Sequence, residues 1–159
     1  MENPGLTRHQ VFTLCPPEHG PPMMSTHHDA EDIHGPTVAR QTELWLRLMG
    51  AGPQPPTSSL TLDRDRDRIF LEQDQGRARL TLARRLPVPQ RQSTLLRLLQ
   101  LLQPEAGGGI PLRAWLAGDA LWISAAAPPD SGAEQWRELA RRQRRLLDRV
   151  MENPHENGQ

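Results

Sequence analysis

Apolar residues recur along residues 37–152 in two different rhythms, and each rhythm predicts a type of secondary structure. A spacing of three to four residues is typical of amphipathic helices and predicts them over residues 37–49, 89–103 and 131–152. Strict alternation is typical of half-buried strands and predicts them over residues 58–63, 68–73, 77–86, 110–117 and 120–126. The order α-β-β-β-α-β-β-α therefore predicts an α+β domain with antiparallel strands.

The first two strands place their apolar residues at positions of opposite parity. Leu60 and Leu62 are even-numbered, whereas Ile69 and Leu71 are odd-numbered. One continuous strand would put these pairs on opposite faces, because side chains alternate along a strand. We therefore predict a hairpin turn within the charged run at 63–68, with its charges in solvent. The run also offers aspartates for a calcium loop, but its alternating arginines argue against that ion.

The middle helix is apolar on two sides and therefore needs two partners. Its main face follows the i, i+3, i+4, i+7 pattern and consists of Leu95, Leu98, Leu99 and Leu102. A second apolar side is formed by Leu96 and Leu101. One side can cover the sheet, and we expect a second copy of the chain to cover the other.

The hairpin predicted over residues 110–126 also carries apolar residues on both faces. One face consists of Ile110, Leu112, Ala114, Leu116, Leu121, Ile123 and Ala125. Trp115 and Trp122 have the opposite parity and belong to the other face. Since each face of a strand presents alternate residues, we expect this hairpin to make contacts on both sides.

The last helix combines an apolar stripe with many arginines. Ser131 and Glu134 have the spacing of a capping box at its start. The predicted buried stripe consists of Trp136, Leu139, Ala140, Leu146, Leu147 and Val150. The arginines are Arg137, Arg141, Arg142, Arg144, Arg145 and Arg149. They leave a nucleic-acid-binding module open as an alternative, but acidic residues on the same helix favour a solvated face with local ion pairs and make nucleic acid an unlikely partner.

The first 36 residues differ in composition from the rest. They are rich in proline, glycine and histidine, lack periodicity apart from a short apolar spot at Val11, Phe12 and Leu14, and carry five acids against one arginine, a net charge of −4. Since the whole chain is neutral, the remainder carries +4. We predict a disordered tail over residues 1–36, a folded domain over 37–152 and a disordered C-terminus over 153–159.

Several classes of function are disfavoured by composition. Lysine is absent, which excludes a P-loop lysine and a Schiff-base lysine. Cys15 is the single cysteine and cannot form an intramolecular disulfide. No apolar run is long enough for a signal peptide or a membrane span, so we expect a cytoplasmic protein with no membrane partner.

No active site or cofactor site is expected either. The chain has no GxSxG motif, and Cys15 lies beside proline with nothing to fix a histidine against it. The tail holds potential metal ligands, at His27, His28, Asp29, Glu31, Asp32 and His34. Their spacing matches no known metal site, so we expect no metal, no cofactor and no enzymatic activity.

Four segments resemble the class I type III secretion chaperones, the CesT/SycE-like family. They are the strand pair LTLDRDRDRIFLEQ and RARLTLARRLPVP, the leucine helix STLLRLLQLLQ, the hairpin IPLRAWLAGDALWISAAAP and the tryptophan-containing helix AEQWRELARRQRRLLDRV. Together they cover about residues 38–151. The resemblance rests on the pattern of elements and not on single-residue motifs.

This resemblance implies an α/β sandwich with a twisted antiparallel sheet and flanking helices. It implies a homodimer formed through the second helix and the neighbouring strand, for which the candidate residues are Leu95, Leu98, Leu99, Leu102 and Leu112. It also implies that the N-terminal segment of a secreted effector wraps the dimer in extended form, held by apolar grooves and strand addition. The candidate residues for effector contact are Leu60, Leu62, Ile69, Leu80, Trp115 and Trp122.

Two features depart from the family. Its members are usually acidic, whereas this domain is not, and the tail before the first helix is longer than expected. Both departures leave open a second function on the same fold, in which the protein is a regulatory protein or co-chaperone that binds an apparatus component or a regulator of secretion.

Overall fold

The computed structural model describes residues 35–55 and 57–152. The helices are α1 (Gly35–Leu48), α2 (Arg91–Leu101) and α3 (Ala133–Met151). The strands are β1 (Ser59–Arg64), β2 (Asp67–Asp74), β3 (Arg77–Arg85), β4 (Arg113–Ala117) and β5 (Ala120–Ala126). Two short 3-10 turns are added, η1 (Val88–Gln90) before α2 and η2 (Pro104–Gly107) after it. The predicted α+β fold and the order of its helices and strands are confirmed.

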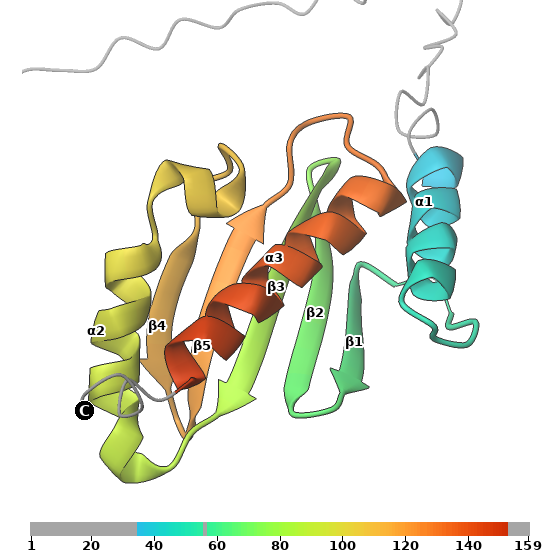
Figure 1. Ribbon diagram of the computed structural model, residues 1–159. Coiled ribbons are helices and arrows are strands. Elements are labelled where there is room, and N and C mark those ends of the chain that lie inside the picture. The colour runs from blue at the N-terminus through green and yellow to red at the C-terminus, as the bar shows by residue number, and fades with distance from the viewer. Residues whose placement is uncertain (1–34, 56, 153–159) are drawn as a thin grey trace, which may run out of the picture.

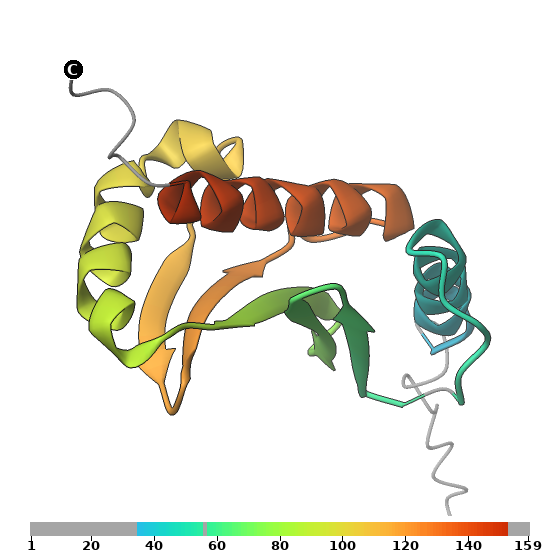
Figure 2. The same ribbon diagram turned by 60° about the horizontal axis from the view of Figure 1, so that its bottom comes forward.

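The five strands form one antiparallel sheet in the order β1-β2-β3-β5-β4 (Figure 1). Helix α3 crosses one face of this sheet and contacts β3 and β5. Helices α1 and α2 flank α3, with α2 beside β4 (Figure 2). No helix in the described part of the chain covers the opposite face, which we call the open face.

The core lies between the sheet and α3. Alternating strand residues supply one layer, including Ile69, Leu80, Leu82 and Ile123, all fully buried. The stripe predicted for the last helix supplies the other layer and is buried throughout, at Trp136, Leu139, Ala140, Leu146, Leu147 and Val150. Burial of each large apolar side chain contributes about 1.5–3 kcal/mol, so this layer provides most of the favourable free energy of folding.

The β1–β2 hairpin has the predicted turn. Leu60 lies opposite Leu71 and Leu62 opposite Ile69, so all four side chains point toward the core. The turn itself consists of Asp65 and Arg66, since Arg64 pairs with Asp67. The change of parity between the two strands is therefore produced by this tight connection.

Most boundaries lie one or two residues from the predicted ones, and the largest shift is at β4. The middle helix begins at Arg91 after a 3-10 turn and ends at Leu101, and the fourth strand begins only at Arg113. Pro111 lacks the amide hydrogen that a strand ladder requires, which explains the late start of β4.

The predicted capping box of α3 is wrong by one residue. The side chain that reaches back is Gln135, whose Oε1 accepts a hydrogen bond from the Gly132 amide at 3.0 Å. Ser131 instead accepts the indole hydrogen of Trp136, at 3.0 Å. The amide of Ala133 donates to Gln41 Oε1 of α1, at 2.9 Å, so a helix from another part of the chain completes the cap.

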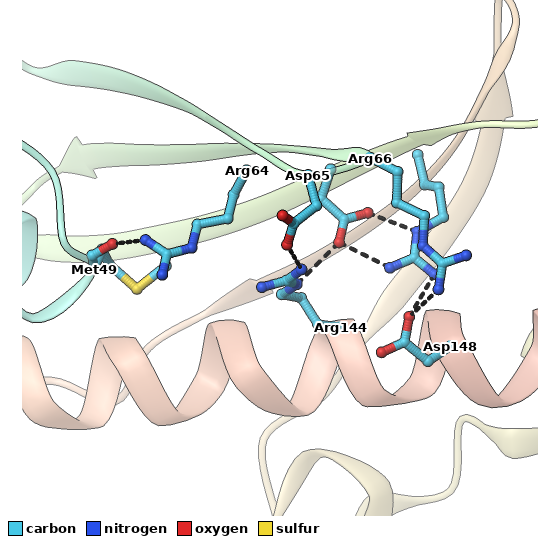
Figure 3. A network of polar contacts seen from close by, with 8 residues as sticks. Met49, Arg64, Asp65, Arg66, Arg144 and Asp148 are labelled. Atoms are coloured by element: carbon cyan, nitrogen blue, oxygen red, sulfur yellow. Dashed lines mark hydrogen bonds and ion pairs between the residues drawn. The ribbon is translucent and has the colours of Figure 1, made fainter.

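The charged run at 63–68 is not wholly in solvent, which corrects the prediction. Asp67 is 2% exposed and pairs with Arg84, which is 1% exposed, through hydrogen bonds of 2.6 and 2.8 Å. Arg144 of α3 donates to Asp67 at 3.0 Å and to Asp65 at 2.8 Å. We call Asp65, Arg66, Asp67, Arg84, Arg144 and Asp148 the charge network, of which Asp67 and Arg84 are buried (Figure 3).

Asp148 completes this network from α3. Its Oδ1 accepts hydrogen bonds from Arg84 and Arg66, each at 2.8 Å. The network holds three carboxylates and three guanidinium groups, so it is neutral as a whole. It joins the β1–β2 hairpin to the last helix through contacts between residues 77 to 82 positions apart in the chain. Some of the arginines of α3 therefore stabilise the fold.

The network shifts the pKa values of its members. Burial alone would raise the pKa of Asp148, but hydrogen bonds and charge attraction from Arg84 and Arg66 outweigh it and hold that pKa below its ordinary value. Burial likewise opposes ionisation of Arg84 and Arg144, yet their aspartate partners raise the pKa of both. Arg84, Arg144 and Asp148 are therefore charged at neutral pH.

We predict that Arg84→Met lowers the free energy of unfolding by about 3–5 kcal/mol, because it leaves the Asp67 carboxylate buried without its main partner. Urea denaturation measures the loss. The double variant Arg84→Met, Asp67→Leu is the control, and it should recover much of the lost stability because no unpaired buried charge remains. A single variant as stable as the parent would contradict a structural role for the network.

We predict that Asp148→Asn lowers the free energy of unfolding at pH 7 by about 1 kcal/mol, a value reduced for the partial exposure of Asp148. Because the folded-state pKa is depressed, this contribution is complete above the ordinary aspartate pKa of about 4 and is lost as pH falls through the lowered value. The two proteins should therefore converge in stability on acidification. Glu105→Gln, at an exposed site, is the control and should show no such pH-dependent difference.

Candidate functional site

Three aromatic rings form a continuous row across the open face. Phe70 of β2 stacks on Trp122 of β5 with ring centroids 5.4 Å apart, and Trp122 stacks on Trp115 of β4 at 6.0 Å. Strand β3 lies between β2 and β5 and carries Thr81 and Ala83 on this face. The small side chains of these two residues leave room for the larger rings to meet above them.

Hydrogen bonds fix this aromatic row in place. The indole of Trp122 donates to the Ala117 carbonyl at 3.2 Å. Beside it, the hydroxyl groups of Thr81 and Ser124 are buried and hydrogen-bonded to each other at 2.8 Å. Trp115 remains 39% exposed at the end of the row. The rings therefore offer an ordered apolar platform to a partner, at little cost in side-chain entropy.

The platform borders a groove of about 680 Å³ on the open face. Besides the aromatic row, the groove is lined by three basic residues, Arg77, Arg79 and Arg113, and by one acidic residue, Glu72. The groove therefore combines an apolar floor with a net positive rim. Such a surface suits a chain segment that carries apolar side chains and acidic residues.

A second groove, of about 800 Å³, lies between α1 and the start of β1. Its apolar lining includes Val38, Leu46, Pro53 and Pro55. Strand β1 is at the edge of the sheet, so one side of its backbone has no strand partner within the described part of the chain. An edge strand beside an apolar groove can accept an added strand from another chain.

The opposite edge of the sheet carries α2 and β4. Leu96 and Leu99 of α2 are 55% and 45% exposed, although both are large apolar residues. Among the residues expected at the dimer interface, Leu98 is fully buried in the core, and Leu95, Leu102 and Leu112 are partly buried against it. Only Leu99 of that predicted set is well exposed, and Leu96, which was not in the set, lies with it on the surface.

The residues expected to contact an effector separate into two groups. Leu60, Leu62, Ile69 and Leu80 are buried beneath the helices, where no partner reaches them without unfolding of the core. Trp115 and Trp122 lie together on the open face. Phe70 was not predicted in this row, although its parity, opposite to that of Ile69 and Leu71, places it on the same face as the two tryptophans.

The arginines of α3 mostly form ion pairs. Arg137 pairs with Glu134 at 2.7 Å and Arg142 with Glu138 at 3.2 Å, while Arg145 lies 3.7 Å from Glu138. These are the expected local pairs, and the longer-range pairs of Arg144 were not foreseen. Most guanidinium groups of this helix are therefore already neutralised, which weakens the nucleic-acid alternative.

Two further observations concern other kinds of site. Within residues 35–55 and 57–152, no group of three or more histidine, cysteine, aspartate or glutamate side chains is placed to hold a metal ion. In the same ranges, no helix has the length and apolar character needed to cross a membrane. The predicted tail ligands from His27 to His34 lie outside the described residues.

The helix-covered sheet with α2 at one edge is the fold of the class I type III secretion chaperones, which confirms the resemblance seen in the sequence. A chain of the ExoU–SpcU complex from the type III secretion system of Pseudomonas aeruginosa shares it, with a TM-score of 0.50 and 21% sequence identity over 68% of this chain and 93% of that one. The SsaM family model matches residues 36–150. The chain therefore belongs to the SsaM family, which is associated with type III secretion.

Two more distant similarities were found. YbjN from E. coli has a TM-score of 0.48 and 12% identity, covering 70% of this chain and 87% of its own. A chain of the HopA1–SchA chaperone–effector complex has a TM-score of 0.43 and 19% identity, covering 74% of this chain and 91% of its own. Both similarities are too low to support an inference about function. No curated protein matches the chain significantly in sequence.

Proposed function

We propose that this protein is a cytoplasmic, non-enzymatic chaperone of type III secretion that binds the N-terminal segment of a secreted effector and keeps it competent for secretion. The observation that carries the proposal is the ordered aromatic row on the open face, in a chain of a secretion-associated family. A globular protein without a partner seldom leaves three stacked aromatic rings on an uncovered sheet face.

The surfaces available favour a client in extended form. The open-face groove spans residues of β2, β3, β4 and β5, and the groove beside α1 includes residues just before the edge strand β1. An extended segment could add to β1 through its backbone and place alternate apolar side chains in the grooves. Holding a client without its own tertiary structure is the property that a secretion chaperone needs.

We further propose that the protein is a homodimer formed through α2 and β4. Leu96 and Leu99 expose apolar area on the outer side of α2, and β4 presents the second free edge of the sheet. A two-fold axis brings the same patch of each copy together. Leu96 and Leu99 of one copy would therefore pack against Leu96 and Leu99 of the other. The open face and the β1 edge remain accessible in this arrangement.

Affinity purification of the tagged protein from its own bacterium, read by mass spectrometry, tests the function. Recovery of one dominant secreted protein, held through its N-terminal segment, supports the chaperone role. Recovery of an apparatus component or a secretion regulator would indicate that the protein regulates secretion instead. Recovery of nucleic acid alone would contradict the proposal.

We predict that Trp115→Ala weakens binding of the recovered client about tenfold or more, because the ring is an exposed anchor of the aromatic row. Isothermal titration calorimetry measures the affinity, and circular dichroism checks the fold. Val88→Ala is the matched control, since Val88 in η1 is 71% exposed and lines neither groove. Equal affinities for parent and Trp115→Ala would exclude the open face as the client surface.

We predict that Leu99→Asp converts the dimer to a monomer, because it places a charge in an apolar interface. Light scattering coupled to size exclusion measures the mass. Ser59→Asp is the control, since it adds the same charge at a polar, exposed position of β1, at the other edge of the sheet. A soluble Leu99→Asp protein that is still dimeric would show that the interface lies elsewhere.

A further inference from the structure

We infer that residues 11–22 of this chain bind the groove on the open face. A segment of the protein itself then covers the surface that is proposed to bind its client. Four observations support this inference. They are the position at which the tail meets the domain, the length of the intervening chain, the chemistry of the segment and the charge of the groove.

The tail joins the domain close to the groove. The chain enters α1 at Gly35, and the first turns of that helix, with Thr37 and Val38, line a hollow of about 590 Å³ together with Arg77. Arg77 is also a lining residue of the open-face groove. The root of the tail and the end of the groove therefore meet at the start of β3.

The intervening chain is long enough to reach the aromatic row. Twelve residues, 23–34, separate the segment from α1. They span up to about 40 Å when extended, at roughly 3.3–3.6 Å per residue. Strand β3 has nine residues and spans about 30 Å. The segment can therefore lie anywhere along the groove without displacement of α1.

The segment has the chemistry that an aromatic row accepts. Its sequence, VFTLCPPEHGPP, contains three apolar anchors at Val11, Phe12 and Leu14, followed by two proline pairs. Proline-rich segments have a preformed extended conformation and dock in aromatic-lined grooves with a small loss of entropy. The stacked rings of Phe70, Trp122 and Trp115 form such a lining.

Charge favours the same pairing. Residues 1–36 carry a net charge of −4, whereas the groove has three arginines against Glu72. Glu18 lies between the two proline pairs and can approach these arginines. Attraction between the acidic tail and these arginines steers the tail to this face and away from acidic surfaces.

The consequence for function depends on the chaperone proposal. A tethered segment is present at an effective concentration in the millimolar range, so even weak docking keeps it largely bound. A client must then displace the docked segment. In the absence of client the segment covers the aromatic row, and client segments that bind weakly fail to displace it. The docking itself does not depend on whether the client is an effector or a regulator.

The lone cysteine makes the inference directly testable in the full chain. A nitroxide label on Cys15 broadens nearby NMR signals, and the indole signals of the four tryptophans serve as reporters. We expect the strongest broadening at Trp115 and Trp122. Trp136 lines the hollow at the root of the tail. Broadening that is strongest at Trp136, or absent at all four residues, would overturn the inference.

Two controls complete the experiment. Phe12→Ala should weaken docking about tenfold and reduce the broadening at Trp115 and Trp122, whereas Thr7→Ala, outside the segment, should leave it unchanged. Isotope-labelled Cys15→Ser protein mixed with unlabelled protein that carries the nitroxide detects docking between copies. Broadening in that mixture equal to that within one chain would overturn intramolecular docking. If no docking of the tail is detected, the effect of Trp115→Ala on client affinity still tests the proposed function separately.

Discussion

The one-sided covering of the sheet determines most other properties of this protein. A five-stranded sheet has two faces; α3 lies across one of them with α1 and α2 at its two ends, and no helix of residues 35–55 and 57–152 lies over the other (Figure 2). The covered face supplies the core. The open face keeps its aromatic residues, and stacking among Phe70, Trp122 and Trp115 reduces but does not remove their contact with water. The apolar area that remains is a reason to expect a partner.

The charge network fixes how α3 sits on the sheet. Helix α3 carries many arginines. Two of its charged residues, Arg144 and Asp148, connect it to the β1–β2 hairpin and to Arg84 of β3 (Figure 3). Arg64 of β1 also donates to the carbonyl of Met49 at the end of α1. A buried ion pair adds little net stability compared with apolar packing, but it penalises any register in which a charge loses its partner. The network therefore specifies how the hairpin and α3 fit together.

The two free edges and the open face give the fold separate surfaces for separate partners. The exposed leucines of α2 lie at the β4 edge, the apolar groove beside α1 lies at the β1 edge, and the aromatic row lies between them on the open face. A dimer through the first surface leaves the other two accessible. A tail that returns to the open face would cover the aromatic row.

The sequence by itself determined the order of the elements, a hairpin turn within residues 63–68, and the set of residues that share each strand face. Periodicity carries this information because side chains alternate on strands and recur every 3.6 residues on helices. It did not determine which face the helices cover, so Leu60, Leu62, Ile69 and Leu80 were expected at a binding surface and lie in the core instead. The Asp67–Arg84 pair and the cap from Gln41 to Ala133 were likewise invisible, because each joins residues far apart in the chain. Only the tertiary structure decides such contacts, since it alone determines which charged and apolar side chains lose their water.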